Sequence, residues 1–265
     1  MLSSLRHLTR LDATKRTRDW YAANLDRLDR ATSGSLHLNL GMGPGREGLP
    51  AAQKALAAAM ADGLPSGRWL DVGCGLGGPA LQWLDADPLL HVTGLELVPE
   101  ILDRARTHVP RLDGRLRLVG GDADQMPFGP EFDAVIALDS VWHVRDRQQF
   151  VQQAWRALKP GGVLRLTDLA CRPEHLRLYD AAVVAAARKA LGAHALSTAQ
   201  RWTATLHANG FEAVTVTDQT AERVELFEDW SRAVGGALGR GLGYLHQRRA
   251  GGPLAFLRVE ATKEA

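Results

Sequence analysis

Residues 69–80, WLDVGCGLGGPA, join an apolar run to a glycine-rich turn and then to the beginning of a helix. Gly73, Gly75 and Gly78 satisfy the pattern G-x-G-x-x-G, in which a tight turn after a strand presents backbone amides and a helix N-terminus to an anion. The stretch predicts a cofactor site at the first strand of an α/β sheet. Taken alone, it leaves open whether the turn holds the pyrophosphate of a nicotinamide cofactor or another group.

The chain around this turn alternates between strand and helix patterns. Single helices separate the expected strands, which is typical of a parallel sheet with right-handed crossovers. After two further helices, two more apolar runs predict a pair of strands at one edge of the sheet. The seven strands are expected at 68–73, 91–97, 116–124, 132–140, 161–170, 211–219 and 254–263.

These elements predict one α/β domain with a Rossmann-like, doubly wound sheet that is mostly parallel and has an antiparallel last strand. Residues 1–31 are expected to form two helices, and the Gly/Pro-rich segment at 33–50 is expected to be a loop. The expected parts are an N-terminal helical cap at 1–62, a core at 66–170, an inserted cap helix at 171–200, and a C-terminal helix with edge strands at 201–265.

Composition narrows the class of protein. The 265 residues are 45% hydrophobic and 23% charged, as in a globular domain with a large core. The net charge is only +2, with 32 basic and 30 acidic residues, which disfavours a dedicated nucleic-acid binder. No apolar run approaches the roughly 18 residues of a membrane span. Two cysteines provide neither a disulfide framework nor a zinc cluster, and we expect a cytoplasmic protein without a metal.

The neighbours of the turn discriminate between cofactors. Glu96 ends the second expected strand, near the position where an acidic residue binds ribose hydroxyls in adenosine-containing cofactors. Residues 120–140, GGDADQMPFGPEFDAVIALDS, place an Asp-Ala pair after the third strand and Phe-Asp at the start of the fourth, which is not a dehydrogenase pattern. Residues 157–168, ALKPGGVLRLTD, then place a Pro-Gly-Gly turn before the fifth strand.

Together these motifs resemble the class I S-adenosylmethionine-dependent methyltransferases, in particular the small-molecule branch with its natural-product and sugar O-methyltransferases. The resemblance covers residues 66–170 and extends more loosely to 196–220. It implies S-adenosylmethionine (SAM) as cofactor, with the turn facing the methionine end and not a pyrophosphate.

The resemblance also implies roles for individual residues. Glu96 would bind the two ribose hydroxyls, and Leu97 would pack on the adenine. Asp122 would accept a hydrogen bond from the adenine amino group, while the amide of Ala123 meets a ring nitrogen. The methionine part and the sulfonium would be lined by Asp71, Gly73, Cys74, Gly75, and the chain at Leu138, Asp139 and His143.

The acceptor is expected beyond the carboxyl ends of the fourth and fifth strands. His143 is the candidate general base, and Asp168 a candidate to orient it. Sugar and natural-product O-methyltransferases often carry two adjacent histidines at this corner, whereas this chain has Trp142 in the first place. His143 therefore has a second interpretation, as a packed, hydrogen-bonded histidine.

Trp142 and Asp139 also have two interpretations each. The Trp142 ring either forms a wall of the pocket or stabilises a cation, which would suit methylation of carbon or nitrogen. Asp139 either contacts the cofactor amine or caps a helix that begins after it. The acceptor pocket is expected to be closed by residues 21–25 and 37–43 and by the long helix around His175 and Tyr179. Tyr21 and His37 are reserve candidates for polar contacts, and the glycines at 235–243 are candidate mobile edges or surface loops.

The leading hypothesis is methyl transfer to a small, fairly apolar molecule in secondary metabolism, with O-methylation first and C- or N-methylation second. A non-methylating cyclase that keeps the cofactor is an alternative, and an NAD-dependent oxidoreductase is disfavoured. A nucleic-acid methyltransferase is disfavoured because no Asn-Pro-Pro-aromatic motif follows the fourth strand. The expected partner is the small-molecule acceptor, without nucleic acid or membrane, and a homo-oligomer is compatible with the sequence.

Overall fold

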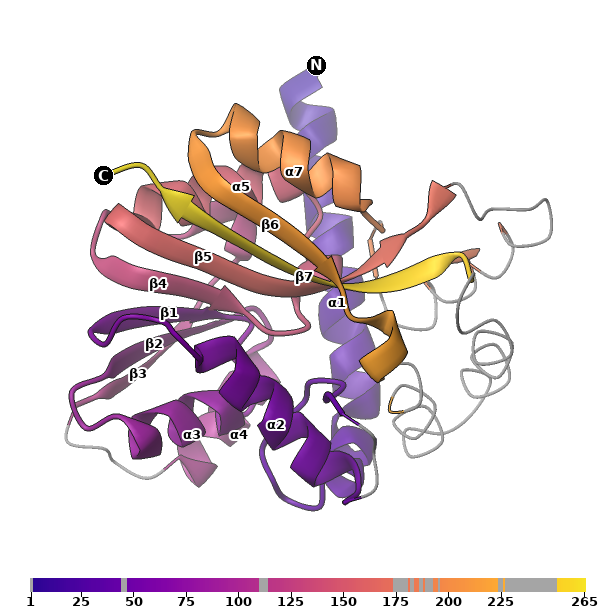
Figure 1. The fold of residues 1–265 in the computed structure, drawn as a ribbon. Coiled ribbons are helices and arrows are strands. Elements are labelled where there is room, and N and C mark those ends of the chain that lie inside the picture. Colours follow the sequence, from indigo (N-terminus) through magenta and orange to yellow (C-terminus); the bar gives the residue numbers. More distant parts are fainter. Residues whose placement is uncertain are drawn as a thin grey trace.

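The computed structural model describes a single sheet with helices on both faces (Figure 1). His175, Tyr179 and the glycines at 235–243 lie outside the described residues, as does most of the expected inserted helix. The side chains of 2–14, 29 and 31 are also outside the description. The described residues are 2–43, 47–109, 114–173, 181, 184–185, 188, 193–194, 196–223, 226 and 252–265.

The sheet has seven strands in the order β3-β2-β1-β4-β5-β7-β6. The first five are parallel, and β7 is antiparallel to both of its neighbours, which confirms the predicted fold class. The strands are β1 (Arg68–Val72), β2 (His91–Glu96), β3 (Leu116–Gly120), β4 (Phe132–Ala137), β5 (Leu158–Cys171), β6 (Phe211–Asp218) and β7 (Leu254–Lys263).

The helices form two layers. In Figure 1, α2, α3 and α4 lie below the sheet, α5 and α7 lie above it, and α1 runs past the ends of the strands. The helices are α1 (Leu2–Ala31), α2 (Leu49–Ala61), α3 (Gly78–Ala86), α4 (Pro99–His108), α5 (Arg147–Ala157) and α7 (Ala199–Ala208), with short 3₁₀ helices η1 (Ala123–Gln125) and η2 (Val141–His143).

Two details differ from the sequence-based expectation. Residues 2–31 form one continuous helix and not two, because no proline or glycine interrupts them. The Pro-Gly-Gly turn lies inside β5. Phe132 of β4 pairs with Leu158 and Ala134 pairs with Val163, so residues 159–162 of β5 form a bulge. Gly161 adopts a φ of 74° there, which a glycine tolerates.

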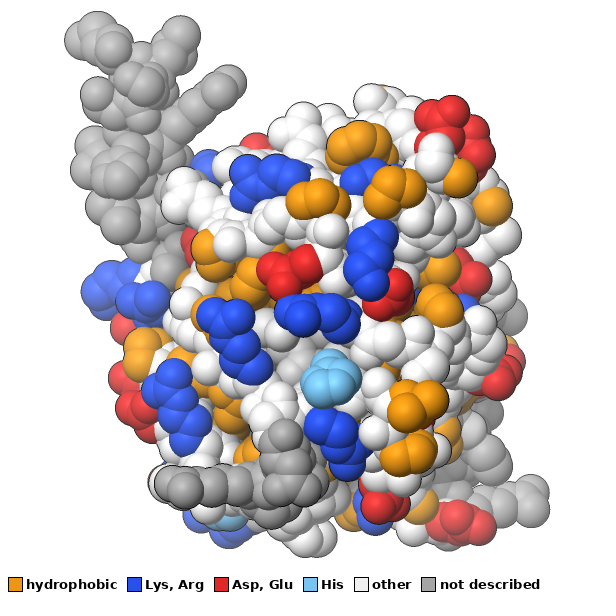
Figure 2. Space-filling view, turned by 90° about the vertical axis from the view of Figure 1, so that its left-hand side faces the viewer, with side chains coloured by type: hydrophobic (Ala, Val, Ile, Leu, Met, Phe, Trp, Pro, Cys, Tyr) orange, Lys and Arg blue, Asp and Glu red, His pale blue; other side chains and the backbone are white. Residues whose placement is uncertain are grey.

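The parallel strands place their carboxyl ends at one edge of the sheet, beside α1, and this edge holds the candidate site. Figure 2 shows the face at the amino ends of the parallel strands, away from that edge. Figure 2 shows acidic and basic side chains mixed on this face. The pairs Arg68–Glu131 and Lys159–Asp133 join the starts of neighbouring strands.

Candidate active site

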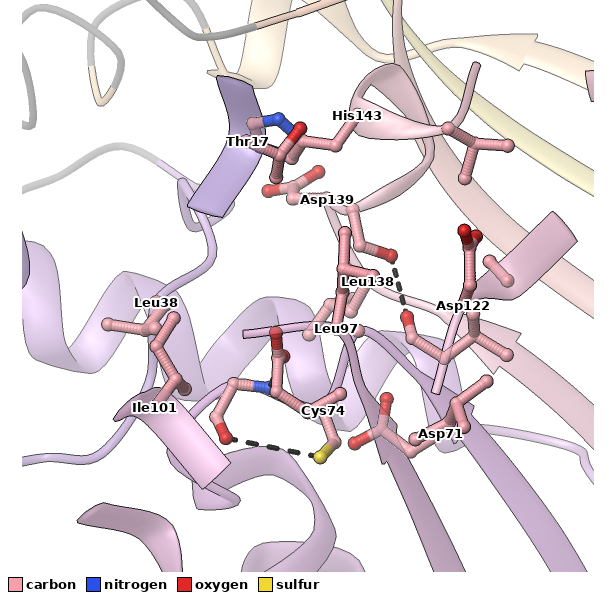
Figure 3. A pocket seen from close by; sticks show the side chains of 18 of the residues that line it. Thr17, Leu38, Asp71, Cys74, Leu97, Ile101, Asp122, Leu138, Asp139 and His143 are labelled. Atoms are coloured by element: carbon pink, nitrogen blue, oxygen red, sulfur yellow. Dashed lines mark hydrogen bonds between the residues drawn. The ribbon is translucent and has the colours of Figure 1, made fainter. Parts of the chain in front are cut away.

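A cavity opens at the carboxyl ends of β1, β2 and β4, and α1 contributes one wall (Figure 3). Its empty space, with the open solvent at the mouth included, is about 980 Å³. Trp142 and Asp168 are not among its lining residues. The predicted site residues that line it are Asp71, Gly73, Cys74, Gly75, Glu96, Leu97, Asp122, Ala123, Leu138, Asp139 and His143.

The amides of the glycine turn are already used inside the protein. Gly73 and Cys74 both donate to the carbonyl of Leu95, at 2.7 and 3.2 Å. Gly75 donates to Oε2 of Glu96 at 3.0 Å. These donors therefore face the neighbouring strand and its terminal carboxylate, and they do not form a cradle for phosphate oxygens.

Two backbone amides at the start of α3 also donate to carbonyls of the protein. Gly77 donates to the carbonyl of Cys74, and Gly78 donates to the carbonyl of Leu36. A Cβ at Gly78 would lie 2.6 Å from that carbonyl, so the segment before α2 lies directly against the helix N-terminus. The turn has the glycine spacing of a dinucleotide site, but the amides of residues 73, 74, 75, 77 and 78 are bonded within the protein, which disfavours the pyrophosphate interpretation.

Gly73 holds the turn against the loop that follows β4. Its φ is 74°, and a Cβ at this position would lie 2.5 Å from Cβ of Ser140. Ser140 is fixed there because its hydroxyl donates to the carbonyl of Val72 at 2.6 Å. A glycine is needed at this position for both the backbone conformation and the close approach.

Glu96 is buried at the floor of the cavity, with its carboxylate held by two backbone amides. Oε2 accepts from Gly75 at 3.0 Å and Oε1 accepts from Val98 at 2.9 Å. Burial raises the pKa of this carboxyl, and the backbone hydrogen bonds oppose that rise. Each oxygen keeps acceptor capacity, so the carboxylate can also bind hydroxyl groups in the cavity.

Asp71, at β1, is the second buried carboxylate of the floor. Burial, and then the charge of Glu96, raise its pKa to about 7. Its Oδ2 has no hydrogen-bond partner within the part of the chain that the structure describes. A buried acceptor without a partner is costly, so this oxygen fits a site for an external cation or donor.

Asp122 follows β3 and begins η1. Its Oδ1 accepts from the amide of Asp124 at 3.0 Å, so the side chain caps the short helix while it also lines the cavity. Figure 3 shows Asp122 and Asp71 on the same side of the cavity, with Leu38 and Ile101 across from them.

Both carboxylate oxygens of Asp139 accept hydrogen bonds from other parts of the protein. It has a φ of 52°, and its carboxylate accepts from Thr167 Oγ1 at 2.6 Å, from the amide of Leu40 at 2.8 Å and from Arg223. The predicted helix-capping role is wrong, because η2 begins after Ser140 without a side-chain cap. Asp139 instead fixes the loop after β4 to the segment before α2.

His143 lies at the upper end of the cavity beside α1 (Figure 3). The indole Nε1 of Trp142 donates to Nε2 of His143 at 2.9 Å, and the hydroxyl of Tyr21 lies 3.1 Å from the same nitrogen. An indole N–H can only donate, so Nε2 accepts and the neutral ring carries its proton on Nδ1. Burial, and then Glu96 and Asp139, raise the pKa of Tyr21 well above its ordinary value, which keeps that hydroxyl protonated.

Asp168 does not contact His143, so the predicted orienting contact is wrong. Its carboxylate accepts from Arg147 at 3.2 Å and from the indole of Trp202 at 2.9 Å. Burial raises the pKa of Asp168, and Arg147 opposes that rise. His37 also lies outside the cavity lining, where it bonds the carbonyl of Ser35 and the side chain of Gln82.

Sequence reasoning missed several partners in this site. Arg223, which pairs with Asp139, received no role, and neither did Thr17, whose buried hydroxyl lines the cavity near His143. Tyr21 was a reserve candidate only. The indole of Trp142 is buried in a cluster with Leu28 and Leu40 and does not present its face to the cavity.

Comparison with known proteins gives the following relationships. Residues 70–166 match the family described as "Methyltransferase domain". The chain is 36% identical over 168 residues to erythromycin 3''-O-methyltransferase of Saccharopolyspora erythraea, covering 61% of this chain and 55% of that protein. The match thus spans about half the length of this relative, and a smaller share of others, such as 40% of the 27-O-demethylrifamycin SV methyltransferase of Amycolatopsis mediterranei.

Solved structures show the same fold. Geranyl diphosphate C-methyltransferase of Streptomyces coelicolor superposes with a TM-score of 0.80 at 15% identity, over 95% of this chain and 98% of that one. The 4+2 cyclase SpnF superposes with a TM-score of 0.78 at 19% identity, over 95% and 97% of the two chains.

The described residues contain neither a membrane-spanning helix nor a cluster of metal ligands. Within that part of the chain, no helix is long and apolar enough to cross a membrane. The same residues contain no group of three or more His, Cys, Asp or Glu side chains that could hold a metal ion.

Proposed function

We propose that this chain is a class I methyltransferase that transfers a methyl group from SAM to a small-molecule acceptor. The match of residues 70–166 to the family described as "Methyltransferase domain" supports this proposal. The preferred acceptor atom is a hydroxyl oxygen. The likeness to an O-methyltransferase over 61% of the chain supports this choice.

The observation that carries the proposal is the charge of the cavity floor. Two buried carboxylates, Asp71 and Glu96, face the cavity, and the amides of the glycine turn between them are already bonded. A pyrophosphate would meet negative charge and few donors there. A cofactor with an ammonium, a sulfonium and two ribose hydroxyls is complementary to the same surface.

The residues present fit SAM. Asp71, with its unpartnered oxygen, would hold the ammonium, and Glu96 would accept from the ribose hydroxyls. Leu97, Asp122 and Ala123 would hold the adenine. When bound, the cofactor supplies a methyl group that is activated by the positive sulfur, so the protein must align an acceptor with it and exclude water.

The acceptor end needs a path for the hydroxyl proton. His143 Nε2 is kept as an acceptor by Trp142, and Tyr21 is kept protonated 3.1 Å away. The indole N–H of Trp142 occupies the one lone pair of Nε2, so Nε2 takes the proton of an acceptor hydroxyl, directly or through the Tyr21 hydroxyl, only when that proton replaces the Trp142 hydrogen bond. The buried position of Trp142 gives no support to the cation-stabilising role that C- or N-methylation would require.

Binding of S-adenosylhomocysteine (SAH) tests the cofactor assignment. We expect calorimetry to show binding to the wild type, and Glu96→Gln to weaken it by about 1–3 kcal/mol. A glutamine places an amide donor against Gly75 or Val98, where the carboxylate accepts, and loses a charge-assisted acceptor for the ribose.

The matched control is Glu131→Gln, which removes a half-exposed carboxylate paired with Arg68 on the distant face. It should leave SAH affinity unchanged. Binding of NAD but not SAH to the wild type would contradict the proposed function. Binding of SAH without transfer of a tritiated methyl group to any of a panel of hydroxylated macrolides and phenols would favour a non-methylating role.

Affinity for SAH should depend on pH through Asp71. Its pKa is about 7 in the folded protein, above the ordinary 3.8. Ionisation of Asp71 therefore lowers the stability of the folded protein as pH rises through 7. A ligand ammonium bound to the ionised carboxylate offsets this loss. SAH should bind more tightly as pH rises to about 7, with proton release below this pH, and the affinity should then level off.

Calorimetry between pH 5.5 and 8, in buffers of different ionisation enthalpy, measures both the affinity and the released proton. Asp71→Asn should remove most of the pH dependence, although Glu96, whose pKa is also raised, retains its own titration. A pH profile unchanged in Asp71→Asn would mean that another group controls binding.

A further inference from the structure

Asn39 is a buried residue of the cavity to which the sequence analysis gave no individual role. It lies in the segment between α1 and α2, is 4% exposed and lines the cavity. The preceding Leu38 lies on the glycine turn, since a Cβ at Gly75 would be 3.1 Å from Leu38 Cδ1. Asn39 is therefore fixed next to the part of the cavity floor that faces the methionine end of the proposed cofactor.

The orientation of the Asn39 amide is determined by its neighbours. Its Oδ1 accepts from the backbone amide of Gly41 at 3.0 Å, and a backbone amide can only donate. The oxygen must therefore face Gly41. The backbone carbonyl of Asn39 accepts from Gln53 Nε2 at 2.7 Å, which fixes the segment from the other side.

The Nδ2 group of Asn39 has two N–H donors and no partner within the described residues. Asp71 Oδ2, a buried acceptor of the same cavity, also has no partner there. A donor and an anionic acceptor that both lack partners complement a carboxylate and an ammonium. Both groups occur on one α-carbon at the amino-acid end of the proposed cofactor.

Other donors near this end are already used. The amides of Gly73, Cys74 and Gly75 bond Leu95 and Glu96, so they are not available to a ligand carboxylate. The buried Thr17 hydroxyl lies beside His143 at the other end of the cavity (Figure 3). Three lining side chains have a buried donor without a partner among the described residues: Thr17, Asn39 and Arg145. Arg145 follows His143 and η2, and Asn39 is the one whose neighbour, Leu38, contacts the glycine turn.

We propose that Asn39 is a positioning residue that binds the cofactor carboxylate through Nδ2, so that Asn39 and Asp71 together select a cofactor with an intact zwitterionic amino-acid end. This inference rests on the proposed function. It adds a residue and a selectivity: a nucleoside thioether without the amino-acid end cannot use either group.

Two ligands separate this role from a structural one. SAH carries the amino-acid end, whereas 5′-methylthioadenosine (MTA) has the same adenosine and thioether with only a methyl group in its place. Asn39→Asp keeps the acceptor for Gly41 and replaces the donor by a carboxylate oxygen. Calorimetry should show SAH weakened at least about tenfold, as expected for a charge-assisted hydrogen bond replaced by repulsion, with MTA within about twofold of wild type.

Asn39→Ala is the second variant. It is needed if Asn39→Asp, which adds a third buried carboxylate to Asp71 and Glu96, does not fold. It should weaken SAH by about three- to tenfold and leave MTA unchanged. Asn209→Asp is the matched control, because Asn209 ends α7 away from the cavity and its Nδ2 donates to the carbonyl of Thr205. Circular dichroism confirms that each variant is folded before titration.

The outcomes are distinct. If SAH and MTA weaken equally in both Asn39 variants, Asn39 only maintains the shape of the segment and the assignment is overturned. If wild type binds SAH and both variants bind it equally well, the assignment is also overturned while the proposed function stands. A wild type that binds neither ligand overturns the proposed function and the assignment with it.

Discussion

Replacing Arg223 by alanine is expected to lower the free energy of unfolding by about 3–5 kcal/mol, because it leaves a buried carboxylate without its cation. The side chains of Arg223 and Asp139 are 0% and 1% exposed. Arg223 Nε also donates to the carbonyl of Gly41 at 3.0 Å, and its guanidinium lies 5.1 Å from the Phe256 ring centre. Urea denaturation followed by circular dichroism measures the loss.

The control is Arg258→Ala, which removes a partly exposed pair with Glu260 and should cost at most about 1 kcal/mol. Adding Asp139→Asn to Arg223→Ala should recover part of the stability, since the unpaired charge is then removed. A loss below about 1 kcal/mol in Arg223→Ala would show that water reaches Asp139 and that the pair is not buried in solution.

Gly73→Ala should cost about 1–2 kcal/mol for the left-handed backbone and a further 1–3 kcal/mol for the overlap with Ser140. The new methyl group can be accommodated only if the turn moves away from the loop after β4. Such a movement shifts both sides of the proposed cofactor site, so SAH binding should be lost as well as stability. Denaturation and calorimetry on the same preparation measure both effects.

Gly63→Ala is a close match as a control. Gly63 has a φ of 72°, nearly the 74° of Gly73, but a Cβ there would meet nothing within 4 Å. This variant should show only the backbone cost of about 1–2 kcal/mol and bind SAH as wild type does. Equal losses in the two variants would mean that the contact with Ser140 is unimportant.

Local patterns in the sequence predicted most of the fold. Alternating strands and helices, the turn at Gly73 and the carboxylate at Glu96 depend on neighbours along the chain, and the structure has each in the expected place. The prediction of two helices in residues 1–31 was wrong, because this segment contains no proline or glycine that would end a helix.

Side-chain partners were less predictable because they depend on directions and on distant segments. Successive residues of a strand point to opposite faces, so Thr167 reaches Asp139 while Asp168 points to Arg147 and Trp202 on the other layer. The contact of Tyr21 with His143 joins residues 122 positions apart. Residues 21–25 were expected to close the acceptor pocket, but no local pattern specifies which side chain of α1 meets His143.

The position of β7 between β5 and β6 sets an order of events during synthesis. Nine residue pairs join β7 to β5, and β6 reaches the sheet only through β7. Residues 211–218 therefore emerge from the ribosome before the strand they pair with exists. Until residues 254–263 follow, β5 remains an open edge that another chain could pair with, so newly made molecules are most prone to aggregate, and most in need of a chaperone, during this interval.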